Sequence, residues 1–233
     1  MSTTWLITGA NRGIGFALVK QLLADPANTV FATCRAPEAA SALRALEGKL
    51  HIIKLDVGDA ASIAESVAPM QATLGAQGLD YLINNAGRVS TWGEKAFTLD
   101  AAELATTFRV NTIGPALVTQ AYLPLLEKGS RRVIVHVSSS LGSFNKGGIS
   151  PTAPAYAMSK AALNMLTAKQ AAERTDLIPF SVCPGWVSTD MGTKAAKTTP
   201  EECASDLVKL ITSASREKHA GKFLERDGRV IHF

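Results

Sequence analysis

Short runs of apolar and β-branched residues alternate with longer helical patterns along the whole 233-residue chain. The runs expected to form strands are residues 5–8, 29–33, 50–55, 79–83, 132–137, 180–182 and 222–224. The segments expected to form helices are residues 14–24, 38–46, 60–74, 101–126, 155–173 and 200–212. Runs such as "YLINN" and "VIVHV" are apolar almost throughout, which is typical of parallel strands covered on both faces. The alternation therefore predicts one doubly wound, Rossmann-type α/β domain over residues 1–233.

Composition and charge exclude several classes of protein. The formal net charge is +4, and Lys and Arg are scattered, so a nucleic-acid partner has no support, although a small anion would suit the chain. Three widely spaced cysteines without a CxxC pair indicate a reducing compartment, and four histidines without ligand spacing predict no metal site. The start of the chain lacks a basic leader, and the uncharged run 110–126 is too short and polar to span a bilayer. We therefore expect a cytoplasmic protein without a membrane partner.

The stretch "TGANRGIG" follows the first expected strand and opens the first expected helix. Glycines at such a turn let the backbone approach a pyrophosphate, and the helix N-terminus supplies N–H donors. The alternative is a tight turn that binds nothing. The spacing is Gly-x-x-x-Gly-x-Gly, which differs from the commonest dinucleotide fingerprint. The candidate cofactor-binding residues here are Gly9, Asn11, Arg12, Gly13, Ile14 and Gly15.

The end of the second expected strand predicts which dinucleotide binds. Enzymes that use NAD usually place a carboxylate there, whereas this chain has Cys34 followed by Arg35. A guanidinium can bind a 2′-phosphate, and Arg12 could reach it from the other side. Either arginine alone could be an ordinary solvated residue, but together they predict NADP(H). After the third strand, Asp56 could bind the adenine amino group or cap the next helix, for which Asp59 is the better cap.

Tyr156 and Lys160 are four residues apart in "YAMSK", on one face of an expected helix. On an arbitrary helix, such a pair would be two solvent-exposed side chains without a functional role. The alternative is a phenol whose pKa is lowered by the ammonium group until it can exchange a proton near neutrality.

Seven motifs, in order, make the chain resemble the short-chain dehydrogenase/reductase family. They are "TGANRGIG", "LDV" at 55–57, "NNAG" at 84–87, Asn111 in "RVNTIG", "VSSSLG" at 137–142, "YAMSK" and "PGWVSTDMG" at 184–192. "FATCR" and "GKFLERDGRVIHF" resemble the small NADPH-dependent carbonyl reductases related to the C-factor and sniffer proteins. The resemblance implies a seven-stranded parallel sheet and an NADP-dependent oxidoreductase that interconverts CH–OH and C=O groups.

The resemblance also implies a catalytic group of Asn111, Ser139, Tyr156 and Lys160. Tyr156 would be the general acid/base, Lys160 would hold the nicotinamide ribose, and Ser139 would donate a hydrogen bond to the carbonyl oxygen. Asn111 would help to hold a proton-relaying water, and Gly114 and Pro115 predict an irregular helix there. Ser138 and Ser140 remain alternatives to Ser139. Further cofactor contacts fall on Val57, Asn85, Ala86, Gly87, Pro184, Gly185, Val187 and Thr189.

Apolar side chains near these motifs predict a hydrophobic ketone or aldehyde as the substrate. The candidate pocket residues are Trp92, Phe144, Trp186 and Met191, each of which could equally be a packing residue. The family also implies a homodimer or homotetramer, through the helices near 101–126 and 155–173. Two rival functions are an NADP(H)-sensing regulatory protein, which would be expected to lack Tyr or Lys, and a methyltransferase, which would want an acid after the second strand.

Overall fold

A seven-stranded sheet forms the centre of the computed structural model, which describes residues 2–147, 149–193 and 195–233. Its strands are β1 (Thr3–Ile7), β2 (Asn28–Cys34), β3 (Leu50–Lys54), β4 (Tyr81–Asn84), β5 (Val133–Val137), β6 (Ile178–Cys183) and β7 (Phe223–Glu225). They pair in the order β3-β2-β1-β4-β5-β6-β7, and every pairing between neighbours is parallel. The predicted seven-stranded parallel sheet is confirmed. The strand order reverses between β1 and β4, and ligands of such sheets bind at this switch point.

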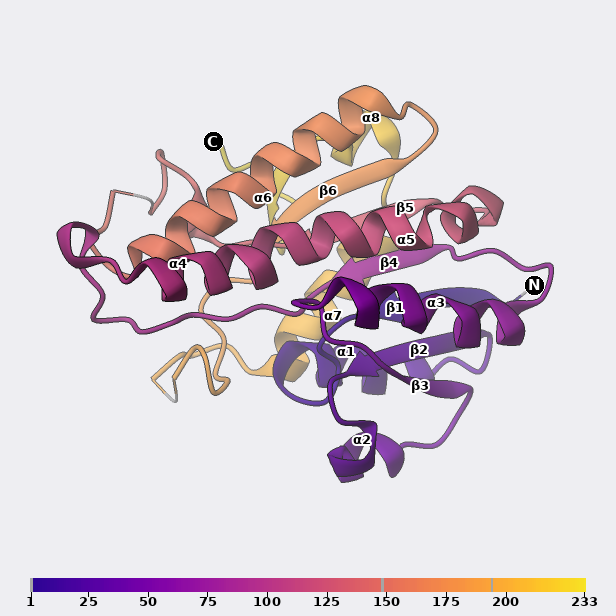
Figure 1. Cartoon of the computed structure of the whole chain (residues 1–233). Helices are drawn as coiled ribbons and strands as arrows, with labels where there is room; N and C mark the ends of the chain where they lie inside the picture. Colours follow the sequence, from indigo (N-terminus) through magenta and orange to yellow (C-terminus); the bar gives the residue numbers. More distant parts are fainter. Residues whose placement is uncertain (1, 148, 194) are drawn as a thin grey trace.

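Helices cover both faces of the sheet (Figure 1). They are α1 (Gly13–Leu23), α2 (Ser41–Arg44), α3 (Ala60–Leu74), α4 (Ala101–Phe108), α5 (Gly114–Lys128), α6 (Pro154–Glu173), α7 (Pro200–Thr212) and α8 (Arg216–His219). The alternation of side chains along β1 divides the core: Trp5 and Ile7 pack with α1 and α7, whereas Leu6 packs with α3 and α5 on the opposite face. None of the helices in the described ranges is long and apolar enough to cross a membrane.

The expected helix over residues 101–126 is interrupted. Helix α4 ends at Phe108, a π-helical turn spans Arg109–Ile113, and α5 begins at Gly114. The N–H of Gly114 donates to the carbonyl of Arg109, five residues back, and Pro115 has no N–H to give to the carbonyl of Asn111. The predicted irregularity near Asn111 is therefore confirmed, and it leaves Asn111 at the bend.

Two other differences are small. The expected helix over 38–46 is shorter, a 3₁₀ turn at Pro37–Ala39 followed by α2, in which Leu43 alone is buried. So small an apolar face offers little packing to extend a helix. The sequence does not predict helix α8, whose N-cap Ser215 accepts a hydrogen bond from the N–H of Lys218. Helices α3 and α7 have the expected bounds, and each begins at a capping side chain, Asp59 or Thr199.

Candidate functional site

A cleft of about 1050 Å³ lies at the carboxyl ends of the strands, across the switch point between β1 and β4. The residues predicted to bind the cofactor that line it are Gly9, Asn11, Arg12, Gly13, Ile14, Arg35, Asp56, Val57, Asn85, Ala86, Gly87, Tyr156, Lys160, Pro184 and Thr189. They come from five strand–helix connections and from α6. The structure thus brings most of the predicted cofactor-binding residues into one continuous hollow.

Three predicted contacts lie elsewhere. Gly15 is packed inside the turn, where an added Cβ would collide with the carbonyl oxygen of Gly9 and the amide of Asn85. Val187 is buried and forms an isolated β-bridge with Thr198. Gly185 lines a second, smaller hollow beside the turn after β7, which is described below. Gly15 and Val187 therefore shape the cleft from behind its surface.

The glycine turn has the backbone that its sequence requires. Gly9 and Gly13 have φ values of +65° and +57°, in the region that side chains disfavour. A Cβ on Gly9 would also lie 3.0 Å from the Cα of Ala86, so the turn approaches the β4 loop closely. Helix α1 begins here without a side-chain cap, which leaves its first N–H groups available to an anion.

The two arginines predicted to bind a 2′-phosphate both line the cleft, but they differ in what they contact. The Arg12 guanidinium makes a 2.8 Å ion pair with Asp190, across the mouth of the cleft. Arg35 follows β2, beside Cys34 and without a carboxylate at the strand end. On the third strand's loop, Asp59 caps α3, while Asp56 accepts a 2.9 Å hydrogen bond from the N–H of Gly58.

Tyr156 and Lys160 lie one turn apart on α6, with exposed fractions of 8% and 3%. The Lys160 ammonium donates a 2.7 Å hydrogen bond to the carbonyl of Val137 and lies 5.6 Å from the centroid of the Tyr156 ring. Burial lowers the pKa of Lys160 to about 8. Burial also raises the pKa of Tyr156 to about 12, in spite of a hydrogen bond with Ser139 that acts in the opposite direction. The fall in the Tyr156 pKa predicted from Lys160 is therefore not found, because burial dominates the Tyr156 pKa and the ammonium group does not contribute to it.

The three consecutive serines have different surroundings. Ser139 lowers the pKa of the Tyr156 phenol, which places the two hydroxyls near each other, and the Ser139 hydroxyl accepts from the N–H of Leu141, at 3.2 Å. Ser138 is buried and turned toward the backbone of α6, where its hydroxyl lies 3.4 Å from the carbonyl of Lys160. Ser140 begins the 3₁₀ turn Ser140–Gly142. Ser138 lines the cleft and Ser139 does not, so Ser139 is favoured among the three only by its interaction with the Tyr156 phenol.

Asn111 is fully buried and its side chain holds the loop after β4. Its amide exchanges two 2.8 Å hydrogen bonds with the backbone of Arg88 and donates a third, of 3.0 Å, to the Ser159 hydroxyl. Gly87 lies against both functional groups, because a Cβ there would be 3.4 Å from Asn111 Oδ1 and 3.5 Å from Lys160 Nζ. Asn111 therefore stands behind the cleft wall, next to Lys160.

The four predicted pocket residues are not all together. Trp92 meets the Tyr156 ring edge-on, with centroids 5.9 Å apart, and Met191 lines the cleft. Phe144 is 74% exposed, and Trp186, which is 60% exposed, lines the second hollow. Of the four, Trp92 thus contacts Tyr156 and Met191 lines the cleft.

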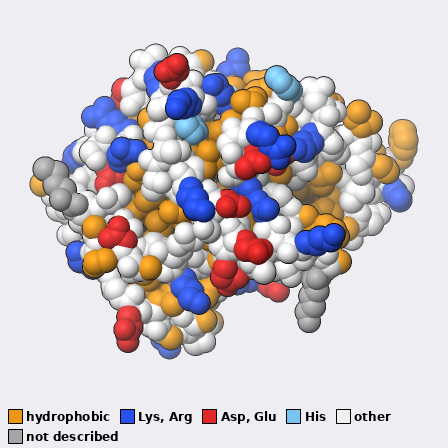
Figure 2. Space-filling model, turned by 180° about the vertical axis from the view of Figure 1, so that it is seen from behind, with side chains coloured by type: hydrophobic (Ala, Val, Ile, Leu, Met, Phe, Trp, Pro, Cys, Tyr) orange, Lys and Arg blue, Asp and Glu red, His pale blue; other side chains and the backbone are white. Residues whose placement is uncertain are grey.

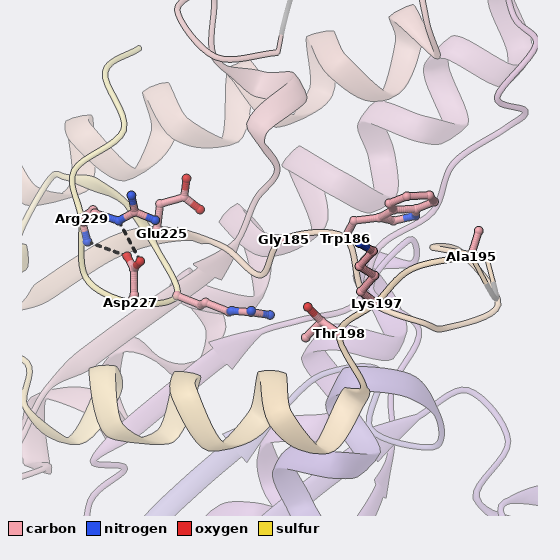
Figure 3. Close-up of a pocket in the computed structure, with 9 residues that line it drawn as sticks. Gly185, Trp186, Ala195, Lys197, Thr198, Glu225, Asp227 and Arg229 are labelled. Atoms are coloured by element: carbon pink, nitrogen blue, oxygen red, sulfur yellow. Dashed lines mark hydrogen bonds and ion pairs between the residues drawn. The ribbon is translucent and has the colours of Figure 1, made fainter.

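The second hollow, of about 390 Å³, lies between the loop after β6 and the turn after β7 (Figure 3). Four of its charged side chains are paired within the protein: Arg229 contacts Asp227 at 2.7 Å, Arg226 contacts Asp206 at 3.3 Å, and Glu225 contacts Lys146. On the face shown in Figure 2, acidic and basic side chains are likewise interspersed. Within the described ranges no three His, Cys, Asp or Glu side chains are arranged to hold a metal ion.

Other lining residues were not predicted from the sequence as cofactor contacts. They are Cys34, Ala36, Ala39, Leu55, Gly58, Asp59, Arg88, Thr106, Arg109, Val110, Val137, Ser188, Asp190 and Pro200, together with Ser138, which was predicted only as an alternative to Ser139. Three of them had a sequence signal that could have predicted a place in the cleft, because Arg88 directly follows "NNAG" and Ser188 and Asp190 flank Thr189. Thr106 in α4 and Arg109 in the π-helical turn had none, because neither belongs to a sequence motif that predicts a cofactor contact.

Comparison with known proteins agrees with this architecture. The family model described as "short chain dehydrogenase" matches residues 3–200. "Short-chain dehydrogenase RED3" of Pyricularia oryzae is 35% identical over 248 residues, covering 99% of this chain and 98% of that protein. The structure of the carbonyl reductase Sniffer of D. melanogaster has a TM-score of 0.94 and 31% identity, with 100% of both chains covered. An NADPH-bound carbonyl reductase from chicken fatty liver has a TM-score of 0.91 and 33% identity, covering 100% of this chain and 94% of that chain.

Proposed function

The chain belongs to the short-chain dehydrogenase/reductase family, and we propose that it is an NADPH-dependent reductase of hydrophobic ketones or aldehydes. One observation carries the proposal. Tyr156 and the Lys160 ammonium are buried side by side on the wall of a cleft that continues past the glycine turn to Arg35, and the half-buried Ser139 interacts with the Tyr156 phenol. The same group would also catalyse the reverse reaction, oxidation of the alcohol.

The residues of the cleft fit NADP(H). The uncapped N-terminus of α1 suits the pyrophosphate, and Arg35 and Arg12 suit a 2′-phosphate at the end of β2, where no carboxylate would repel it. Lys160 Nζ has one hydrogen bond to Val137 and further donors for the nicotinamide ribose. The similar carbonyl reductase from chicken fatty liver was crystallised with NADPH bound, which supports the same cofactor here.

When bound, the cofactor supplies the hydride that reaches the carbonyl carbon. The protein then has to stabilise and protonate the carbonyl oxygen. Tyr156 holds its proton at neutral pH, because burial raises its pKa to about 12, so in the reducing direction it is a donor ready for the developing alkoxide. Ser139 donates a hydrogen bond to the same oxygen, and the positive charge of Lys160 favours the phenolate that is left.

The apolar groups beside Tyr156 support a hydrophobic carbonyl substrate. Trp92 lies edge-on to the phenol and Met191 lines the same cleft. A pocket with this lining gains affinity from burying apolar surface.

The assembly and the cellular location remain proposals. Met158 and Met165 are exposed on α6, and Ile113 is exposed on the π-helical turn that precedes α5. These exposed apolar side chains support a homo-oligomer formed through these helices. Light scattering of the purified protein measures this directly, and a monomer at micromolar concentration would contradict it. A cytoplasmic location follows from the cysteine usage and stays a prediction.

An NADPH-consumption screen over aldehydes, ketones and quinones tests the function, with Tyr156→Phe as the matched variant. We expect turnover of at least one hydrophobic carbonyl by the wild-type protein. In Tyr156→Phe turnover should fall by at least about 10³-fold, while NADPH still binds, because the variant removes only the proton donor. Turnover of no carbonyl, together with tight NADPH binding, would instead favour the NADP(H)-sensing alternative.

A further inference from the structure

Helix α6, which carries Tyr156, begins without a cap of its own. Its N-cap residue Ala153 has a left-handed backbone (φ +47°) and only a methyl side chain, and Pro154 has no N–H. The N–H of Ala155, the first one in the helix, donates instead to the carboxylate of Glu94, 61 residues earlier in the chain, at 3.1 Å. A negative charge at this end also interacts favourably with the helix dipole. Glu94 thus supplies the cap that α6 lacks.

The same carboxylate organises the turn that carries Trp92. Its second oxygen accepts a 3.2 Å hydrogen bond from the Ser90 hydroxyl, so residues 90–94 fold around it. Trp92 lies in the middle of this turn and meets the Tyr156 ring edge-on. Glu94 therefore connects the two elements whose aromatic rings contact each other in the cleft.

We propose that Glu94 is a positioning residue, which holds Trp92 against Tyr156 and so sets both the orientation of the phenol and the wall of the carbonyl pocket. The inference rests on the proposed function. Proton transfer requires the phenol and the carbonyl oxygen to be within hydrogen-bond reach, and a misplacement of about 1 Å costs as much as 10²-fold in rate. A carboxylate that never contacts the substrate can therefore control the rate through these two rings.

Three variants test the effect on catalysis. In Glu94→Ala we expect kcat for carbonyl reduction to fall at least about ten-fold and KM for the carbonyl to rise, while KM for NADPH is unchanged. Glu94→Gln keeps one oxygen to accept from the N–H of Ala155, and its NH2 group can donate to the Ser90 hydroxyl, so it should restore kcat to within about three-fold of wild type. Glu65→Ala, on the exposed face of α3, is the control and should behave as wild type. An unchanged kcat in Glu94→Ala, or no recovery in Glu94→Gln, would overturn the inference.

Tryptophan fluorescence gives a second measurement that needs no activity. The difference in acrylamide quenching between each protein and its Trp92→Phe counterpart reports Trp92 alone, since Trp5 and Trp186 are common to both. We expect Trp92 to be more accessible to acrylamide in Glu94→Ala than in wild type or Glu94→Gln, with circular dichroism showing that all variants are folded. Equal quenching overturns the inference. If the wild-type protein reduces no carbonyl, the proposed function fails, and the quenching result alone decides the role of Glu94.

Discussion

The side-chain amide of Asn111 makes two hydrogen bonds of 2.8 Å with the backbone of Arg88, one to its N–H and one to its carbonyl. Its second amide hydrogen goes to the hydroxyl of Ser159. The π-helical turn thus ties the loop after β4 to helix α6, which carries Tyr156 and Lys160. Both donors of the amide are used in this way, so the side chain anchors the cleft wall.

Replacing this amide should destabilise the fold. In Asn111→Ala the half-buried N–H and carbonyl of Arg88 lose their side-chain partner and the Ser159 hydroxyl loses one donor, for which we expect a free energy of unfolding lower by about 2 kcal/mol. Urea denaturation measures this change. Asn145→Ala removes one contact of an exposed side chain, with the Phe233 carbonyl, and should cost no more than about 0.5 kcal/mol. Equal stability of the two variants would contradict the anchoring role.

The features that sequence predicts well are those with local causes. Gly9 and Gly13 are required by a left-handed backbone, Asp59 caps α3 at the expected residue, and Pro115 removes a helical donor beside Asn111. Each of these can be recognised within a few residues of the chain. The bounds of α3 and the bend before α5 were predictable for that reason.

Contacts between distant loops could not be predicted in this way. Arg12 meets Asp190 across 178 residues, and Glu94 meets Ala155 across 61, with no periodicity or spacing to indicate either pair. The predicted fall in the pKa of Tyr156 was wrong for a related reason. The spacing to Lys160 is visible in the sequence, but the burial that raises the Tyr156 pKa depends on the elements packed around α6.

Arg35 should determine the preference for NADPH. In Arg35→Asp a carboxylate replaces the guanidinium at the end of β2 and would repel a 2′-phosphate, so we expect NADPH affinity to fall at least about ten-fold while NADH binds as well or better. Fluorescence titration with both cofactors measures this. Arg44→Asp, an exposed residue of the neighbouring α2, makes the same charge change outside the cleft. Unchanged NADPH affinity in Arg35→Asp would defeat the assignment.

Asp190 should compete with the cofactor for Arg12. The 2.8 Å pair between them is exposed on both sides, so it is worth no more than about 1 kcal/mol. Asp190→Asn removes the competing charge, and we expect NADPH to bind up to about five-fold more tightly, an effect that added salt should reduce. NADH, which lacks the 2′-phosphate, is the internal control and should gain less. An equal gain for both cofactors would show that Arg12 does not contact that phosphate.

Lys160 should leave a signature in the dependence of stability on pH. Burial lowers its pKa from 10.5 to about 8, so between these values the unfolded chain holds a proton that the folded protein has released. Because the unfolded state binds more protons, this residue makes the free energy of unfolding rise with pH in that window, by at most about 1.4 kcal/mol per pH unit.

In Lys160→Met the titrating ammonium group is absent, so the free energy of unfolding of this variant should rise less steeply from pH 8 to pH 10 than that of wild type. Urea denaturation at closely spaced pH values compares the slopes, which are independent of the hydrogen bond to Val137 that the variant also loses. Parallel curves would mean that the Lys160 ammonium is not desolvated in the folded protein. The proposed role of Lys160 beside the Tyr156 phenol would then be supported only by its position, which the hydrogen bond to Val137 fixes.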